Sequence, residues 1–327
     1  GGISYTFTRG FNAAGDVSTL SSQTTPQWLG LSVDYAPNAL GQPQRVSGFA
    51  DDVRYHPNGA VAGYTLANGI AHSVTQNLRG LPAVMSDAGV LQDALGYDLE
   101  ANLTSITDQQ AGVFSRSMAY DGLSRLRQAD APGVWGSATF SYDAADNLRT
   151  ANVGSRAVSL EYADGSNRLT QMVVNGSAVP LGYDSYGNVR SRGPATYGFD
   201  LGNRMSASSQ GGSYAYDGLG RRTVVQSTDG SARLHAYGQD GLLLLSTSNG
   251  GGRPSSGTLY FYLGRKAIAQ WNSASGTQFM HTDALGSPVA RTSIAGAPSV
   301  QRTRFEPFGA VAQGSKPGPA TSLLGFT

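Results

Sequence analysis

The stretch Ser213–Arg222, SYAYDGLGRR, brings together side chains that could perform acid–base chemistry or bind a phosphate group. It contains two tyrosines, one aspartate, two glycines and two arginines within ten residues. A catalytic carboxylate acts at one place in a chain, together with a positioned partner group. Here an aspartate follows an aromatic residue at six places, each time before turn-forming residues. We therefore interpret these aspartates as turn residues, and we predict no catalytic residue and no enzyme activity.

The histidine and cysteine content of the sequence gives little support for a metal or cofactor site. Cysteine is absent, which excludes disulfides, thiolate zinc sites and a cysteine nucleophile. The histidines His56, His72, His235 and His281 show none of the spacings typical of metal ligands. We predict no metal and no cofactor. His281, two residues before Asp283, is the best functional candidate among them, and we expect it to form a hydrogen bond within a turn.

The charge pattern argues against nucleic-acid and membrane partners. The 327 residues carry 23 basic and 22 acidic side chains, and no basic stripe or acidic tail stands out. The longest strongly apolar run, Leu242–Leu245, is far shorter than the roughly 20 residues that span a bilayer. The glycine-rich run 248–257 lacks the pattern of a phosphate loop. We predict no nucleic-acid binding and no membrane span.

An aromatic residue recurs about every twenty residues and organises the chain into repeats. In most copies an apolar residue precedes it by two positions and an aliphatic residue follows it by six, which is typical of two strands joined by a tight turn. Arg222 occupies the aliphatic position after Tyr216, and repetition does not explain it. The repeat aromatics are Tyr97, Tyr120, Tyr142, Tyr162, Tyr183, Phe199, Tyr216 and Tyr237; the aspartates are Asp98, Asp121, Asp143, Asp184, Asp200 and Asp217.

The chemistry of the repeat predicts a fold of stacked hairpins. Aspartate at the start of a turn accepts hydrogen bonds from backbone N–H groups, and the glycine or asparagine after it suits a left-handed conformation. One hairpin cannot bury its apolar face alone, whereas neighbouring hairpins can. With 44 glycines, about twice the usual share, the chain has many turns. We predict an all-β protein with a long antiparallel sheet of hairpins that curls or spirals.

These repeats resemble the YD repeats of RHS proteins, which toxin-complex C components and teneurins share. The copies YDGLSRL (120–126), YDAADNL (142–148), YDSYGNV (183–189), FDLGNRM (199–205) and YDGLGRR (216–222) carry the likeness. The segments 279–296 and 305–310 are similar to the start of the RHS-associated core region. The matching core positions are His281, Thr282, Asp283, Leu285, Gly286, Ser287, Pro288, Phe305, Pro307, Phe308 and Gly309.

The resemblance implies a β-sheet wound into a hollow shell, whole or partial, that encloses a C-terminal toxin. It divides the chain into a repeat shell, residues 1–279, and the start of a truncated core region, residues 280–327. In many members an aspartate-based self-cleavage in the core releases the toxin. This chain ends at SLLGFT, and the aspartates of that reaction are not present in it.

The sequence thus predicts a non-enzymatic shell segment of an exported bacterial RHS-type toxin or surface protein, secreted or on the cell surface. Its first partner would be its own C-terminal cargo, and the resemblance adds secretion-system spikes and toxin-complex components. The alternative is a surface adhesin that binds glycans, because tyrosine rings stack on sugars. In the first hypothesis the same rings hold neighbouring hairpins together. Glycan-array binding that is abolished by changing a few of these tyrosines to alanine would favour the alternative, and binding to no glycan would remove it.

Overall fold

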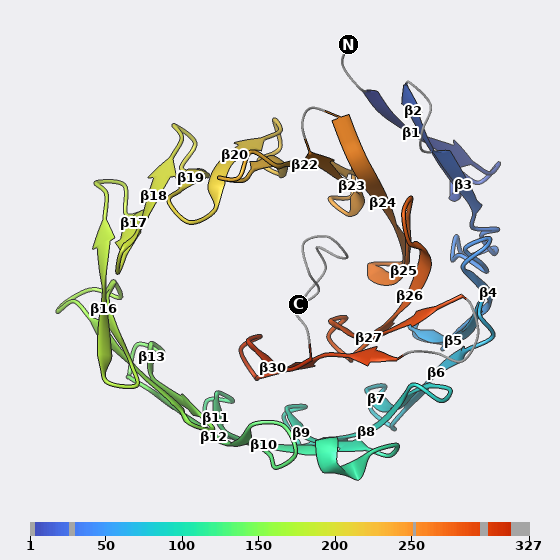
Figure 1. Ribbon diagram of the computed structural model, residues 1–327. Helices are drawn as coiled ribbons and strands as arrows, with labels where there is room; N and C mark the ends of the chain where they lie inside the picture. The colour runs from blue at the N-terminus through green and yellow to red at the C-terminus, as the bar shows by residue number, and fades with distance from the viewer. Residues whose placement is uncertain (1–3, 26–29, 251–252, 295–299, 315–327) are drawn as a thin grey trace. The chain divides into compact units, whose positions relative to one another are not determined.

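The computed structural model describes residues 4–25, 30–250, 253–294 and 300–314. Within them thirty strands account for nearly all regular structure, together with the short 3-10 turn η1 (Gly112–Phe114) (Figure 1). No helix of the described residues is long and apolar enough to cross a bilayer. The predicted all-β fold with a long antiparallel sheet is confirmed.

The chain forms two compact units. Unit 1 comprises Gly1–Ala94, Leu234–Phe305 and Gln313–Thr327, and unit 2 comprises Leu95–Arg233 and Glu306–Ala312. The predicted boundary between residues 279 and 280 rests on the family resemblance and stays a prediction. The final segment 322–327 lies outside the described residues.

Unit 1 contains a small sheet and one continuous part of the large sheet. Strands β1, β2 and β3 form a three-stranded antiparallel sheet, and the large sheet runs from β22 to β28 and then from β4 to β8. The strands, of which β8 and β22 extend past the unit's ends, are β1 (Ser4–Phe11), β2 (Val17–Thr25), β3 (Gly30–Asp34), β4 (Ala50–Tyr55), β5 (Val61–Leu66), β6 (Ala71–Gln76), β7 (Pro82–Asp87), β8 (Leu91–Tyr97), β22 (Ala232–Tyr237), β23 (Leu243–Gly250), β24 (Arg253–Leu263), β25 (Lys266–Asn272), β26 (Gly276–Thr282), β27 (Pro288–Ser293), β28 (Gln301–Arg302) and β29 (Arg304–Phe305).

Unit 2 is a meander in which each strand pairs with the next one in sequence. Its strands are β9 (Leu103–Asp108), β10 (Arg116–Tyr120), β11 (Leu126–Ala131), β12 (Gly136–Tyr142), β13 (Leu148–Val153), β14 (Arg156–Tyr162), β15 (Leu169–Val174), β16 (Ser177–Tyr183), β17 (Val189–Arg192), β18 (Ala195–Phe199), β19 (Met205–Ser208), β20 (Gly212–Tyr216) and β21 (Arg222–Gln226). The short strand β30 (Val311–Gln313) pairs with β29.

Each repeat is one hairpin with a bulge next to its turn. Tyr142 pairs with Leu148 across the hairpin, and the register shifts at that point. An aromatic residue and an aliphatic residue that face each other lie on the same side of the sheet, as the sequence predicted. The same pairing with a register shift joins Tyr120 to Leu126, Tyr162 to Leu169, Tyr183 to Val189, Phe199 to Met205 and Tyr216 to Arg222.

The bulge requires one residue with positive φ, three positions after the repeat aspartate. Glycine occupies it in only two of the six turns that begin with a repeat aspartate, at Gly187 and Gly220. Ala101, Ser124 and Asp146 adopt φ values of 67°, 58° and 62° there. An L-residue is strained in this region, so the hydrogen bonds of the turn must hold these three residues in place. The other occupant is Asn203.

Each unit has its own apolar core. In unit 1 Phe279, Leu66 and Ile268 are almost completely buried, and the ring of Phe49 stacks on that of Phe261 at 3.8 Å between centroids. In unit 2 one face of the sheet pairs large residues with small ones: Phe140 lies opposite Ala151, and Val153 opposite Ala138. This alternation lets adjacent strands fill the face without gaps.

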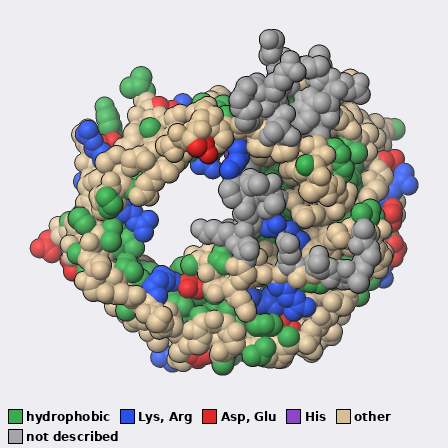
Figure 2. All heavy atoms as spheres, viewed as in Figure 1, with side chains coloured by type: hydrophobic (Ala, Val, Ile, Leu, Met, Phe, Trp, Pro, Cys, Tyr) green, Lys and Arg blue, Asp and Glu red, His purple; other side chains and the backbone are tan. Residues whose placement is uncertain are grey.

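Charged side chains show no separation by sign on the face drawn in Figure 2. On this face lysine and arginine side chains form small groups. Aspartate and glutamate side chains are scattered among the backbone and the uncharged polar side chains. This agrees with the even balance of basic and acidic residues in the sequence.

Candidate functional site

The repeat aspartates organise the turns at one end of the hairpins. Asp143 Oδ1 accepts hydrogen bonds from the backbone N–H groups of Ala145 and Asn147, both at 2.9 Å. Its second oxygen, Oδ2, accepts one from Asn147 Nδ2 at 3.0 Å. Asp121, Asp184, Asp200 and Asp217 repeat this pattern, and Asp98 accepts from the backbone and side chain of Asn102. Both oxygens of these carboxylates therefore accept hydrogen bonds from within their own turns.

The side chain four residues after the aspartate also reaches the next turn. Arg125 donates to Asp121 in its own turn and to Asp146 Oδ1 in the following one, at 2.6 Å. Shorter side chains do the same, and together these bonds connect successive turns along the sheet. The other links are Asn102 to Ser124, Asn147 to Asn167, Asn188 to Asn203, and Arg204 to the carbonyl of Asp217.

The repeat tyrosines form a second connection between hairpins. The Tyr142 hydroxyl donates to the carbonyl of Leu126 in the preceding hairpin, at 2.9 Å, and Arg125 covers the ring at 4.8 Å. Burial raises the pKa of Tyr142, so the phenol stays protonated and can donate. The corresponding hydroxyl bonds run from Tyr120 to Leu103, Tyr162 to Leu148, Tyr183 to Leu169 and Tyr216 to Met205. We call these tyrosine and turn contacts together the repeat ladder.

A ring contact outside the repeat ladder involves Arg222. Its guanidinium lies 5.3 Å from the centroid of the Tyr214 ring, while its backbone pairs with Tyr216. The long side chain of an arginine can cover an aromatic ring. Arg222 thus packs on the aromatic residue two positions before the repeat aromatic by cation–π contact.

Acidification should weaken the repeat ladder. The Asn147 side chain lowers the pKa of Asp143, Asn188 lowers that of Asp184, and Arg204 lowers that of Asp200. A carboxyl whose pKa is lower in the folded state stabilises the fold above its unfolded pKa of about 3.9, and loses this effect as pH falls through the folded value. We expect the urea midpoint of unfolding to change little from pH 7 to pH 5 and to fall steeply below about pH 4.

Asp184→Asn is the matched control for the acid prediction. Asparagine can accept the same two backbone hydrogen bonds but does not titrate, so the midpoint of this variant should depend less steeply on pH. Equal urea midpoints at pH 6 and pH 3 for the unaltered protein would contradict the prediction.

The segment that resembles the core region folds into the same turn. Asp283 Oδ1 accepts from the N–H groups of Leu285 and Ser287 at 3.0 and 2.9 Å, Gly286 has a φ of 96°, and Pro288 begins β27. At the second segment Phe305 is buried, and the hairpin turns through Pro307 and Phe308 to Gly309, whose φ is 83°. The edge of the Phe308 ring meets Phe140 at 5.0 Å between centroids.

His281 does not form the predicted hydrogen bond within that turn. It lies on β26 with its side chain completely buried, because strand residues alternate between faces and this one points into unit 1. Its Nε2 lies 2.9 Å from Thr292 Oγ1, and its Nδ1 lies 3.4 Å from Asp87 Oδ1. The same Asp87 oxygen is 2.9 Å from His72 Nδ1. We call His72, Asp87 and His281 the buried triad.

In the buried triad, Asp87 interacts with both histidines inside unit 1. Burial alone would raise the pKa of Asp87, but polar contacts with His281 and His72 outweigh it and lower the pKa. The Tyr64 ring stacks on His72 at 4.5 Å. Thr292, His281 and Asp87 follow the order of a hydrolase triad, but Thr292 is only 2% exposed and accepts a bond from Asn68. No substrate reaches such a hydroxyl, so the network stabilises the structure.

Sequence reasoning missed His72 and Asp87. They face each other on β6 and β7, and His281 reaches them from a strand about two hundred residues later. No spacing signals such a contact. Among the described residues no group of three or more histidine, aspartate or glutamate side chains is arranged to hold a metal ion.

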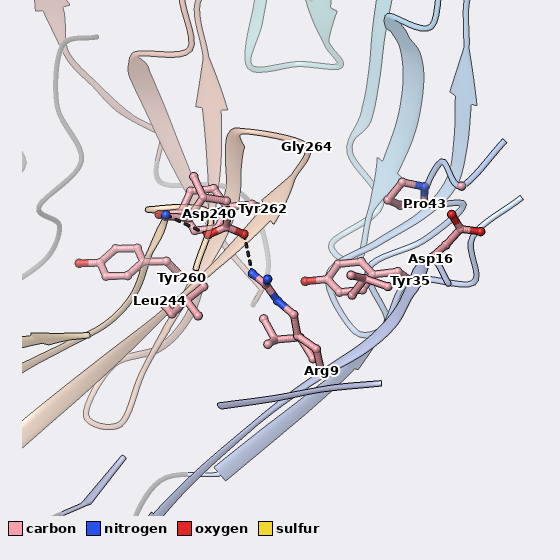
Figure 3. Close-up of a pocket in the computed structure, with 13 residues that line it drawn as sticks. Arg9, Asp16, Tyr35, Pro43, Asp240, Leu244, Tyr260, Tyr262 and Gly264 are labelled. Atoms are coloured by element: carbon pink, nitrogen blue, oxygen red, sulfur yellow. Dashed lines mark hydrogen bonds and ion pairs between the residues drawn. The ribbon is translucent and has the colours of Figure 1, made fainter. Parts of the chain in front are cut away.

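A pocket in unit 1 combines aromatic rings with an ion pair (Figure 3). It measures about 300 Å³ and lies between the β1–β3 sheet with its following loop and the strands β23 and β24. Arg9 Nη2 binds Asp240 Oδ2 at 2.6 Å, and the Tyr35 hydroxyl points toward this pair. Tyr260 and Tyr262 line the other side. None of these residues was predicted as a site.

The geometry agrees with a comparison against known families. The family model described as the teneurin YD-shell matches residues 69–327. This chain belongs to that family. None of the curated protein sequences matches the chain.

Solved structures show the same YD-shell fold. The Photorhabdus luminescens Tc holotoxin pore, with a mutated TccC3, matches with a TM-score of 0.74 and 14% identity, over 94% of this chain and 18% of that one. A TcdB2–TccC3–TEV structure matches with a TM-score of 0.69 and 14% identity, over 95% of this chain and 18% of that one. This YD shell thus spans less than a fifth of each of these two solved chains.

Proposed function

We propose that this YD-shell segment is a structural wall that encloses a polypeptide cargo and performs no catalysis. The repeat ladder carries the proposal. Each hairpin of unit 2 is bound to its neighbour by backbone pairing, and the ladder adds side-chain bonds from turn to turn. Bonds of this kind oppose local separation of the strands at the turn end of the sheet. A barrier must resist such local opening.

The ladder also uses up the groups that would otherwise bind ligands. The repeat aspartates accept bonds from their own turns, and the hydroxyls of five repeat tyrosines donate to the preceding hairpin. A wall that lacks strong binding sites can enclose an unfolded polypeptide without binding it tightly. The glycan-binding alternative, as far as it rests on the repeat tyrosines, loses much of its support here and stays a prediction.

The structural neighbours support an exported toxin as the context. One is TcdB2–TccC3 without a hypervariable C-terminal region, and another is TcdB2–TccC3–Cdc42. By analogy, the cargo of this chain would be a variable segment that follows the wall in the same polypeptide. Secretion or display at a bacterial surface, and assembly with toxin-complex components, complete the proposal.

Protease protection tests the proposal. The chain is produced together with the residues that its own gene encodes after Thr327, and digestion by proteinase K is followed over time. The downstream residues should survive protease concentrations that degrade them when they are produced alone. Equally fast digestion in both forms would contradict enclosure, and rapid cutting at every hairpin would contradict the wall itself.

A further inference from the structure

The hairpin that joins β22 to β23 departs from the repeat at the residue that defines it. Tyr237 occupies the aromatic position, but Gly238 stands where the repeat has aspartate. The turn keeps its backbone bonds: Gly238 N–H donates to the Leu242 carbonyl at 2.8 Å, and Gly241 has the expected positive φ of 79°. The aspartate is therefore dispensable for this turn and appears two positions later, as Asp240.

The space of the missing side chain is taken by the ion pair. A Cβ atom at Gly238 would lie 2.5 Å from Asp240 Oδ1 and 3.2 Å from Arg9 Nη2. Any larger residue at 238 would displace the pair. Asp240 Oδ1 accepts the N–H of Leu242 at 3.0 Å, which leaves Oδ2 to bind Arg9 at the pocket. Here the repeat is altered in a way that positions a carboxylate for a different purpose.

The pocket offers paired polar groups beside aromatic surface. Its two central charges neutralise each other, and Asp16 adds a negative charge at the edge. Tyr35 lies beside Arg9, and burial raises the pKa of Tyr35 to about 12, so its hydroxyl remains a donor at neutral pH. Tyr262 donates its hydroxyl to the Leu243 carbonyl, as in the repeat ladder, which fixes its ring at the pocket wall.

We propose that this pocket binds one or two units of a neutral sugar. About 300 Å³ is at the lower end of small-molecule sites. Sugars present C–H faces to aromatic rings and adjacent hydroxyls to groups that donate and accept, as a guanidinium–carboxylate pair does. An anion would meet an arginine already neutralised and a further carboxylate. A purely apolar ligand would desolvate the ion pair without replacing its water.

Saturation-transfer-difference NMR of the full chain tests the pocket. The sugar probes are lactose, cellobiose, maltose and N,N′-diacetylchitobiose, and acetate and choline represent anions and cations. At least one sugar should bind, and Asp240→Asn should weaken it about tenfold or more, because the substitution keeps the size but removes the charge that orients Arg9. Arg9→Gln should have a similar effect.

Tyr186→Ala is the matched control. Tyr186 is an exposed tyrosine at a repeat turn of unit 2, 80% exposed, and its loss should leave sugar affinity unchanged. Thermal unfolding midpoints of all variants confirm that they fold. Binding of no sugar, binding of only acetate or choline, or sugar binding lost in Tyr186→Ala but kept in Asp240→Asn would overturn the proposal. None of these outcomes bears on the wall function.

Discussion

We expect the Asp87→Ala variant to lose about 3–5 kcal/mol of unfolding free energy. Asp87 is 1% exposed, and one of its oxygens faces both His72 and His281. Alanine would remove the oxygen that lies 2.9 Å from His72 Nδ1 and the carboxylate beside His281 Nδ1. His72 would then remain unsatisfied or draw water into the core. Urea denaturation monitored by circular dichroism measures the loss.

Arg45→Ala is the control for this effect, because it removes a surface ion pair and leaves the bond from Ala36 N–H to Asp34 in place. Asp34 and Arg45 lie 2.9 Å apart, but both side chains are more than 40% exposed. Removing the arginine should cost far less than Asp87→Ala, because water replaces the lost contact. Similar losses for the two variants would show that the buried triad contributes no more than a surface ion pair.

Phe140→Ala should lower the unfolding free energy by about 3–5 kcal/mol, because it opens a cavity in the core of unit 2. Phe140 is 5% exposed and packs against Ala151 across the sheet. Phe308 is 58% exposed, so Phe308→Ala should cost only about 1 kcal/mol. Urea denaturation of both single variants measures these values.

The double variant tests whether the hairpin that contains Phe308 rests on β12. An edge-to-face aromatic pair contributes about 0.5–1.5 kcal/mol of coupling beyond burial. Additive losses in the double variant would mean that the two rings do not interact. A loss for Phe308→Ala as large as that for Phe140→Ala would contradict the exposed position of Phe308.

Local chemistry made much of the fold predictable. The register of Tyr142 with Leu148 follows from the length of the turn, and Asp143 in the turn signals where the strands end. The positive φ of Ala101 and Ser124 was not predictable, because neither residue favours it. There the hydrogen bonds of the aspartate impose the conformation, and the residue type does not reveal it.

Contacts between segments that are far apart in the sequence could not be predicted from it. His281 meets Asp87 from about two hundred residues away, and Arg9 meets Asp240 across 231 residues. Neither pair has a spacing that a repeat or motif encodes. Gly238 gave only a partial signal, because two of the eight copies lack the repeat aspartate, at Ala163 and at Gly238. The missing aspartate therefore does not by itself mark the ion pair, and the partner Arg9 could not be inferred.

The repeat ladder has a consequence for how such proteins change in length. Every side-chain link described for it joins a hairpin only to the adjacent one, so stability is close to a sum of neighbour terms. One copy already lacks a link, since Phe199 has no hydroxyl to donate, and the strands around it still pair. Whole hairpins can therefore be added or deleted by gene duplication or loss, and the remaining hairpins keep their contacts. A lineage can adjust the extent of its sheet in steps of about twenty residues.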